Sequence, residues 1–279
     1  MINGWTYYNH AVIPTVAPHE VPNLEPIKNG TVWSLGKQSL LATWTTDFDC
    51  GYKTEWWYVI KDEPFDINLL KSKHRYVINR GKKYFFVKCI NPLDYSDELY
   101  DVQVAAFSAY PKKYRPNVDK QEFINVLKEW QDNNNIKIYG AYFKENEALC
   151  GYIMVKIQSK CIELKIQKAN PHYEKYQINA ALVNALLTAY EEKLKQGYYI
   201  LDGARSINHE TAFQDYLEKY FRFRKAYCKL NIKYRGIMRF IVGFLYPCRG
   251  LLLKLDNIGI IHSVNALLKM EQCRRSFIN

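Results

Sequence analysis

The chain has 279 residues, of which 48% are hydrophobic and 15% aromatic, so it is long enough for one large domain or two ordinary ones. This composition excludes a disordered polar chain, which would be poor in aromatic residues. The formal net charge is +11. Residues 222–279 contain twelve Lys and Arg but only Asp256 and Glu271 as acids, which leaves +10 there and +1 elsewhere. A polyanionic neighbour of this segment is therefore expected: anionic lipid, a phosphorylated substrate or nucleic acid.

The seven cysteines are widely spaced, form no C-x-x-C pair and follow no secretory signal. Reduced thiols and a cytoplasmic location are therefore expected. His and Cys do not cluster at the spacing of zinc ligands, so no metal site is predicted.

The first 34 residues hold four of the ten prolines and are expected to form an extended lead-in. Residues 35–130 are expected to form an N-terminal lobe. Its predicted strands and helices, in chain order, are two strands at 39–48 and 53–60, a helix at 66–81, a strand at 83–90 and two helices at 97–110 and 119–132.

The polar, turn-forming segment Gln131 to Asn135 indicates a lobe boundary, so a second lobe is predicted over residues 131–235. Its order is three strands, a loop and long helix, a strand, a helix and a last strand. We place them at residues 136–146, 148–158, 161–168, 170–197, 198–203, 209–220 and 223–234. Gly197 stands where a helix C-cap glycine is expected. This order is not that of a doubly wound sheet.

The loop and helix start at residues 170–182 resemble the donor-binding segment of the GNAT acyltransferases. In that family a P-x-Y-R-G-x-G-I-G loop binds the pyrophosphate of acetyl-coenzyme A through backbone amides at a helix start, where unpaired amides and the helix dipole favour phosphate. Pro171, Tyr173, Ile178, Ala181 and Leu182 match the pattern. Lys175, Gln177 and Asn179 stand where the family has small residues.

The resemblance extends over roughly residues 136–235. It implies an α+β fold with a GNAT-like mixed, largely antiparallel sheet flanked by helices. It also implies acetyl-CoA, or another acyl-CoA, as co-substrate and no metal. The implied donor-binding residues are Tyr173, Lys175, Tyr176, Gln177, Ile178 and Asn179.

The later stretch 208–230 resembles the closing helix and strand of the same family, where an N-x-x-A…Y-x-x-x-G-F-R pattern is common. Phe223 and Arg224 match, while Arg222 replaces the glycine. Tyr216 and Tyr220 flank the position of the family's proton-donating tyrosine, and Tyr216 is taken as the candidate. A half-buried structural tyrosine is the alternative for each.

Acyl transfer from a thioester needs a base for the acceptor's proton and donors for the developing oxyanion. The strands at 161–168 and 198–203 are expected to splay apart, which makes Asp202 and His209 the candidate bases. His209 has the more suitable unperturbed pKa, whereas Asp202 needs burial to raise its own. A turn aspartate and a helix-start histidine are the alternatives.

The helix and strand at residues 71–88 are similar to a basic helix and strand of FemA/FemB-like proteins. Those proteins join two GNAT-like lobes in one chain, and their bacterial relatives modify peptidoglycan or cell-surface sugars. The resemblance implies two tandem GNAT-like lobes, with residues 35–130 as a degenerate partner that shapes the acceptor groove.

Residues 236–279 form a basic, amphipathic C-terminal tail with apolar runs of ten or so residues, short of the ~20 that a spanning helix needs. Peripheral membrane contact through this tail is one interpretation. A C-terminal helix that packs back on the lobes is the other.

These observations favour an N- or O-acyltransferase that moves an acyl group from acyl-CoA to an amine or hydroxyl, with a small-molecule or sugar-linked acceptor such as a cell-surface precursor. One alternative keeps the fold but takes aminoacyl-tRNA as donor, so that the basic tail meets RNA phosphates. Another is a binding module without catalysis.

Overall fold

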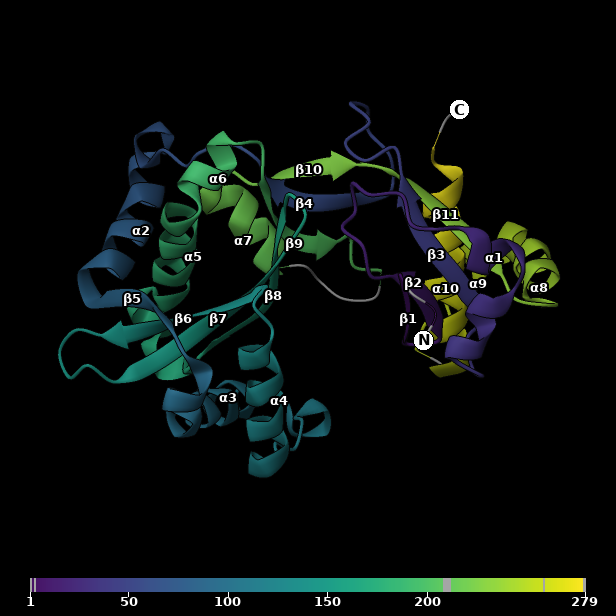
Figure 1. Cartoon of the computed structure of the whole chain (residues 1–279). Helices are drawn as coiled ribbons and strands as arrows, with labels where there is room; N and C mark the ends of the chain where they lie inside the picture. Colours follow the sequence, from purple (N-terminus) through teal and green to yellow (C-terminus); the bar gives the residue numbers. More distant parts are fainter. Residues whose placement is uncertain (1, 3, 208–211, 258, 278–279) are drawn as a thin grey trace. The chain divides into compact units, whose positions relative to one another are not determined.

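The structure is a computed structural model that describes residues 2, 4–207, 212–257 and 259–277. The chain divides into two compact units, each built from segments distant in sequence (Figure 1). Unit 1 comprises Met1–Val59, Ala204–Thr211 and Lys225–Asn279, and unit 2 comprises Ile60–Gly203 and Ala212–Arg224.

Unit 2 holds most of a seven-stranded sheet, whose strands β4 and β10 have residues in both units, and its neighbouring strands are mostly antiparallel. The strand order is β10-β4-β9-β8-β7-β6-β5. Strands β5 to β8 pair antiparallel and β9 pairs parallel to β8. The strands are β4 (Trp57–Lys61), β5 (Phe85–Ile90), β6 (Ile136–Phe143), β7 (Leu149–Gln158), β8 (Cys161–Ala169), β9 (Tyr199–Ala204) and β10 (Arg224–Tyr227). The predicted α+β class, with a largely antiparallel sheet flanked by helices, is confirmed.

Helices pack on the sheet in two groups. Helices α3 (Ser96–Ser108) and α4 (Lys120–Asp132) contact β6, β7 and β8. Helix α5 (Ile178–Ala189) contacts β5, β6 and β7 from the other side, and α2 (Ser72–Tyr84) packs on α5 and on α7 (Ala212–Phe221) (Figure 1). This three-layer arrangement buries both faces of the sheet.

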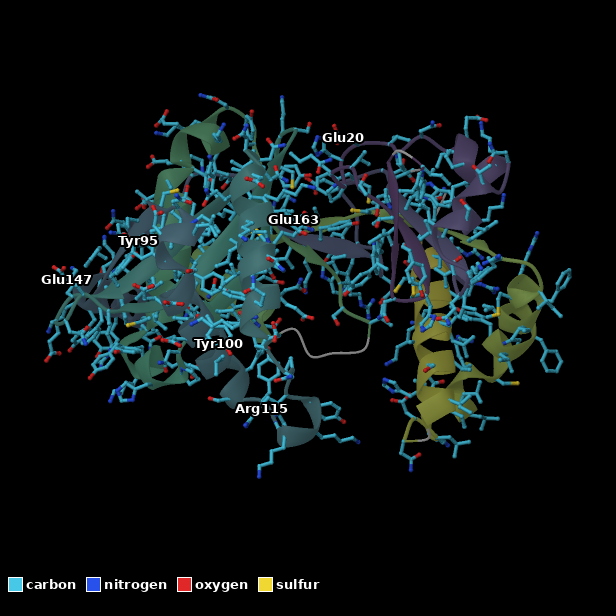
Figure 2. All side chains as sticks on the ribbon, turned by 60° about the horizontal axis from the view of Figure 1, so that its bottom comes forward. Glu20, Tyr95, Tyr100, Arg115, Glu147 and Glu163 are labelled. Atoms are coloured by element: carbon cyan, nitrogen blue, oxygen red, sulfur yellow. The ribbon has the colours of Figure 1, made fainter. Side chains whose placement is uncertain are left out.

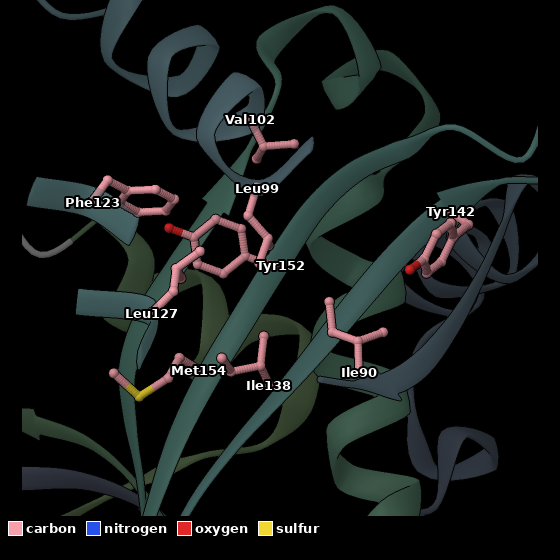
Figure 3. Close-up of a cluster of buried hydrophobic side chains, with 9 residues drawn as sticks. All are labelled: Ile90, Leu99, Val102, Phe123, Leu127, Ile138, Tyr142, Tyr152 and Met154. Atoms are coloured by element: carbon pink, nitrogen blue, oxygen red, sulfur yellow. The ribbon is translucent and has the colours of Figure 1, made fainter. Parts of the chain in front are cut away.

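The core between the sheet and the pair α3–α4 is built from alternate strand residues, which point to the same face of a sheet. Tyr152 and Met154 of β7 pack here with Ile138 of β6 and with Leu127 of α4 (Figure 3). The hydroxyl of Tyr152 donates to Oε1 of Gln103 at 2.7 Å, which satisfies its only buried polar group.

Short helical turns connect these elements. They are η2 (Ile67–Leu69), η3 (Pro92–Tyr95), η4 (Lys112–Tyr114), η5 (Pro171–Tyr176) and α6 (Glu191–Lys195). Glu147, in the β6–β7 turn, and Arg115, after η4, lie at outer ends of unit 2 (Figure 2).

Unit 1 contains a second sheet and the C-terminal helices. The strand order is β1-β2-β3-β11, with β2 and β3 parallel and the other pairs antiparallel. Trp5, Val12, Ile27, Val32 and Ala42 form its buried core. Its elements are β1 (Trp5–Tyr8), β2 (Ala11–Pro14), α1 (Glu25–Lys28), η1 (Thr31–Leu35), β3 (Leu41–Thr46), β11 (Lys229–Tyr234), α8 (Met238–Leu245), η6 (Tyr246–Cys248), α9 (Arg249–Leu253) and α10 (Gly259–Arg275).

Several elements differ from the sequence-based expectation. The lead-in is not extended, because its residues form the hairpin β1–β2, α1 and η1. The strand expected over 223–234 is two strands in two different sheets, β10 and β11, with Cys228 between them. The amide of Cys228 donates to the carbonyl of Trp56 at 2.9 Å, a long-range bond that local pattern does not encode.

The compact units also do not follow the expected boundaries. Residues 35–130 are divided between the units at Val59, and residues 131–135 lie inside unit 2, between α4 and β6. Unit 2 therefore takes the helices α2 to α4 from the segment that was expected to form a separate lobe.

Candidate active site

The candidate site lies where β8 and β9 separate. The two strands pair at three positions only, Cys161 with Tyr199, Ile162 with Ile200 and Glu163 with Leu201. On its other edge β8 carries a bulge, because Met154 pairs with Ile166 and Val155 with Leu164. Lys165 is the extra residue. A bulge bends its strand, so β8 bends directly after its last pair with β9.

A hollow of about 410 Å³ opens at this point within unit 2. Its walls come from five elements and the η5 turn, and most of its lining is polar or aromatic. The lining residues are Leu164–Ala169 of β8, Pro171 and Glu174 of η5, Asn179 of α5, Asp202 of β9, Phe213 of α7 and Ala106, Ala109 and Tyr110 at the end of α3.

Asp202 places a carboxyl group in this hollow, one residue beyond the last β8–β9 pair. Burial raises the pKa of Asp202 to about 7, and the side-chain amide of Gln214 opposes part of the shift. Gln214, which is buried on α7, also donates a long hydrogen bond of 3.5 Å to the main-chain carbonyl of Asp202. A carboxyl group with this pKa exchanges a proton near neutrality, as a general base must.

A second polar pair joins β8 to the start of α5. Nε2 of Gln167 donates to Oδ1 of Asn179 at 2.8 Å, and both residues line the hollow. Oε1 of Gln167 is buried and has no hydrogen-bond partner. Buried acceptors are rarely left unpaired, so this oxygen is suited to accept a hydrogen bond from a ligand.

The first turn of α5 begins at Gln177, which has the left-handed conformation (φ 66°, ψ 44°). No side chain caps this helix start. The amides of a helix's first turn lack partners within the helix, so they can bind an anion.

Helix α2 packs directly beside this turn. A Cβ atom on Gly81 would lie 2.7 Å from the carbonyl oxygen of Gln177 and 2.9 Å from the amide nitrogen of Ala181. Nε of Arg80 donates to the carbonyl of Lys175 at 3.1 Å. The close contact requires glycine, and it brings the basic side chains of α2 to the turn formed by η5 and the start of α5.

No protein-family model and no curated protein matches the chain. Solved structures match it in fold. L-PGS from Bacillus licheniformis is 12% identical, with 97% of this chain and 85% of that chain covered and a TM-score of 0.51. FemX is 7% identical over 75% of this chain and 79% of that chain, with a TM-score of 0.48. PaiA N-acetyltransferase from Thermoplasma acidophilum, in complex with coenzyme A, is 22% identical over 41% of this chain and 74% of that chain, with a TM-score of 0.32.

The fold is GNAT-like. The order of antiparallel strands, then the parallel step from β8 to β9 around α5, agrees with the predicted resemblance. At these identities the likeness concerns the fold alone.

The residues predicted to bind the donor take different positions in this GNAT-like fold. Tyr173 and Tyr176 pack their rings against Phe143, with centroids 5.2 and 5.1 Å away. Ile178 is fully buried, and the ammonium of Lys175 lies 5.1 Å from the ring centre of Tyr176. Among the six predicted residues, only Asn179 lines the hollow. The other five shape the loop.

Tyr216, another predicted catalytic residue, does not line the hollow. Tyr216 packs among Phe213, Tyr220 and Phe221, with centroids 5.9, 4.9 and 5.8 Å away. Its hydroxyl is buried without a hydrogen-bond partner, and burial raises its pKa. His209 lies outside the described residues.

Sequence reasoning missed Gln167, Gln214 and the bulge at Lys165. Alternation along β8 predicts which residues share a face, and Glu163 and Lys165 do form an ion pair of 2.6 Å there. The partner of Gln167 on α5, and the extra residue in the β7–β8 ladder, depend on pairing between segments. The local sequence carried no signal for either feature.

Metal ligands are not gathered in the part of the chain that is described. No group of three or more His, Cys, Asp or Glu side chains there is placed to hold a metal ion.

Proposed function

We propose that the chain is an acyltransferase that moves an acyl group from acyl-coenzyme A, with acetyl-CoA as the first donor to test, to an amine or hydroxyl acceptor. The observation that carries the proposal is the hollow at the β8–β9 separation, which has a carboxyl group of pKa about 7 on one wall and an uncapped helix start on another.

The donor's pyrophosphate is assigned to the first turn of α5. The amides after Gln177 and the amide side chain of Asn179 supply hydrogen-bond donors to phosphate oxygens. The unpaired Oε1 of Gln167 suits an amide N–H of the donor's pantetheine arm. The thioester would then lie along β8, near Asp202.

Asp202 is proposed as the general base. The acceptor's nitrogen or oxygen attacks the thioester carbonyl, its proton passes to the Asp202 carboxylate, and the carbon–sulfur bond breaks to release the coenzyme A thiolate. The proton then held by Asp202 can pass to the thiolate, which restores the base. Tyr216, the residue predicted as proton donor, has a buried hydroxyl and does not line the hollow, and His209 is the alternative base. Direct transfer needs no covalent intermediate on the enzyme.

The assay that tests this proposal follows the release of free thiol from acetyl-CoA in the presence of a panel of amine and hydroxyl acceptors, sugar-linked precursors of the cell surface among them. Asp202→Asn should lower kcat/KM roughly 100-fold or more, as loss of a general base does. Asp215→Asn changes an exposed carboxylate on α7 and should leave the rate unchanged. Equal kcat/KM values for the two variants would show that Asp202 is not the general base.

An aminoacyl-tRNA donor is the second candidate, and one observation favours it. The basic helix α2 lies beside the loop in which Lys175 and Gln177 stand where the GNAT pattern has glycine. Arg80 of α2 donates a hydrogen bond to this loop. A polyanion larger than coenzyme A fits such surroundings. Filter binding of tRNA should then be tight at low salt and weaken steeply as salt rises, whereas acetyl-CoA should not bind.

A further inference from the structure

Helix α8 (Met238–Leu245) carries apolar side chains on two adjacent faces, and Arg239 and Gly243 lie on the remaining side. One face carries Met238, Val242 and Leu245, and the 2% exposure of Val242 shows that this face packs inward, where α8 contacts α10. The adjacent face carries Ile237, Phe240, Ile241 and Phe244, at the i, i+3, i+4, i+7 spacing of one helix side. A helix on the surface of a globular protein normally has one apolar stripe, which faces the core, so this second apolar face is unusual.

Three of the four side chains on this second face are mostly exposed. The side chains of Ile237, Phe240 and Phe244 are 68%, 74% and 81% exposed. Leu251 of α9 is exposed to 67%, and Leu253 and Leu255 follow it. We call the side chains of Ile237, Phe240, Phe244 and Leu251, together with the neighbouring Arg239, Arg249 and Lys254, the α8–α9 surface. Large apolar side chains are seldom this exposed on one side of a helix, and where such side chains gather they mark an interaction site.

The charged side chains assigned to the α8–α9 surface are all cationic. Arg239 and Lys254 are exposed, and Arg249 is half-buried against the ring of Tyr246. No Asp or Glu occurs between Glu218 and Asp256, so no acid in that stretch offsets these cations. Apolar side chains ringed by unopposed cations complement an anionic lipid surface, whose head groups attract Lys and Arg while its acyl boundary takes up Phe and Leu.

The helices here are short. No helix in the described ranges is long and apolar enough to cross a membrane, and α8 has 8 residues. Shallow insertion in the plane of the head groups is the mode that suits such a helix.

We propose that unit 1 docks on an anionic lipid bilayer through the α8–α9 surface. Phe240 and Phe244 insert below the head groups, and Arg239, Arg249 and Lys254 contact the lipid phosphates. The proposal goes beyond acyl transfer and does not depend on it, because the surface belongs to unit 1 and the candidate active site to unit 2.

The test is flotation of the full chain with vesicles of phosphatidylcholine and phosphatidylglycerol, and with vesicles of phosphatidylcholine alone. The wild type should float with the anionic vesicles, and binding should weaken at least about ten-fold on the neutral ones or at high salt. Phe240→Ser with Phe244→Ser should lower the affinity at least about ten-fold, and Arg239→Gln with Lys254→Gln should lower it on anionic vesicles only.

Leu69→Ser is the matched control. Leu69 is 65% exposed and belongs to unit 2, whereas the α8–α9 surface belongs to unit 1. This variant should therefore float like the wild type. Circular dichroism of each variant excludes unfolding as the cause of any loss.

Two results would overturn the proposal. One is failure of the wild type to float with anionic vesicles. The other is equal flotation of the wild type and the Phe240→Ser, Phe244→Ser variant. Light scattering adds a further arm: a dimer that dissociates in the same variant, together with no vesicle binding, would assign the surface to a second copy of the chain instead.

Discussion

At the scale of single residues, Asp202 is expected to make the protein's stability depend on pH. Burial raises its pKa to about 7, from about 3.9 in an unfolded chain. Because the folded state holds the proton more tightly, this group contributes stability that is fully present below about pH 4 and is lost as the pH rises to about 7.

Replacing Asp202 with asparagine removes this pH dependence, since the amide stays neutral. The free energy of unfolding of Asp202→Asn, relative to the wild type, should therefore rise by about 1 to 4 kcal/mol between pH 4 and pH 8. Urea denaturation at several pH values measures the change. Asp215→Asn, the exposed control, should show none, and a flat difference for Asp202→Asn would mean that the carboxyl group is not desolvated.

Gly81 allows α2 to pack closely against the start of α5. Gly81→Ala should destabilise the protein by about 1–3 kcal/mol, because the new Cβ would lie under 3.0 Å from backbone atoms that cannot move aside cheaply. Gly243→Ala in α8, where nothing lies within 4 Å, should be neutral or stabilising by up to about 1 kcal/mol. Thermal unfolding of the two variants would contradict this packing if their midpoints shifted alike.

At the scale of elements, periodic patterns predicted most helices and strands. Helix α4 was expected over residues 119–132, where Phe123, Val126, Leu127 and Trp130 fall on one face of a helix. Asp119 caps it, accepting a hydrogen bond from the amide of Glu122 at 2.8 Å. Phe123 and Leu127 are buried, whereas Val126 stands at the edge of that face and is 37% exposed. The hydrophobic pattern thus predicted the helix and its buried side. Which residues at the edge of that side are covered depends on the sheet on which α4 packs.

These neighbouring positions on α4 allow a matched test. Leu127→Ala should lower the free energy of unfolding by about 2–5 kcal/mol, because it leaves a cavity in the core shown in Figure 3. Val126→Ala removes apolar atoms from the exposed edge and should cost less than about 1 kcal/mol. Denaturant titration of both variants decides, and similar losses would show that α4 does not pack through Leu127.

The candidate site was only partly predictable for the same reason. The GNAT-like order of elements predicted that the two strands separate near Asp202, which follows their last pair although β9 itself continues to Ala204. The bulge at Lys165 and the bond from Gln167 to Asn179 could not be predicted, because each depends on the register between segments that are distant from each other in sequence. The predicted roles of Tyr216 and His209 stay predictions.

At the scale of the whole molecule, the compact units differ from the lobes expected from the sequence, because pairing between distant segments determines them. The chain passes between the units four times, and unit 1 joins β3 to β11 with Leu41 opposite Tyr234. The hydroxyl of Thr54 donates to the carbonyl of Cys228 at 3.0 Å, across 174 positions of sequence. Such pairings leave no local signature, so turn-forming segments alone suggested boundaries in the wrong places. The charge asymmetry, in contrast, was readable directly, and it lies largely in unit 1.

The central claim is that the first turn of α5 and the adjoining hollow bind an acyl donor, and calorimetric titration with acetyl-CoA tests it most directly. The wild type should bind, and Gln177→Glu with Asn179→Asp should abolish binding, because two carboxylates would then oppose the pyrophosphate. Gln121→Glu with Asn125→Asp makes the same chemical change on exposed positions of α4 and should bind like the wild type. Equal binding by all three proteins would place the donor elsewhere, and no binding by the wild type would contradict the acyl-CoA proposal and favour the aminoacyl-tRNA donor.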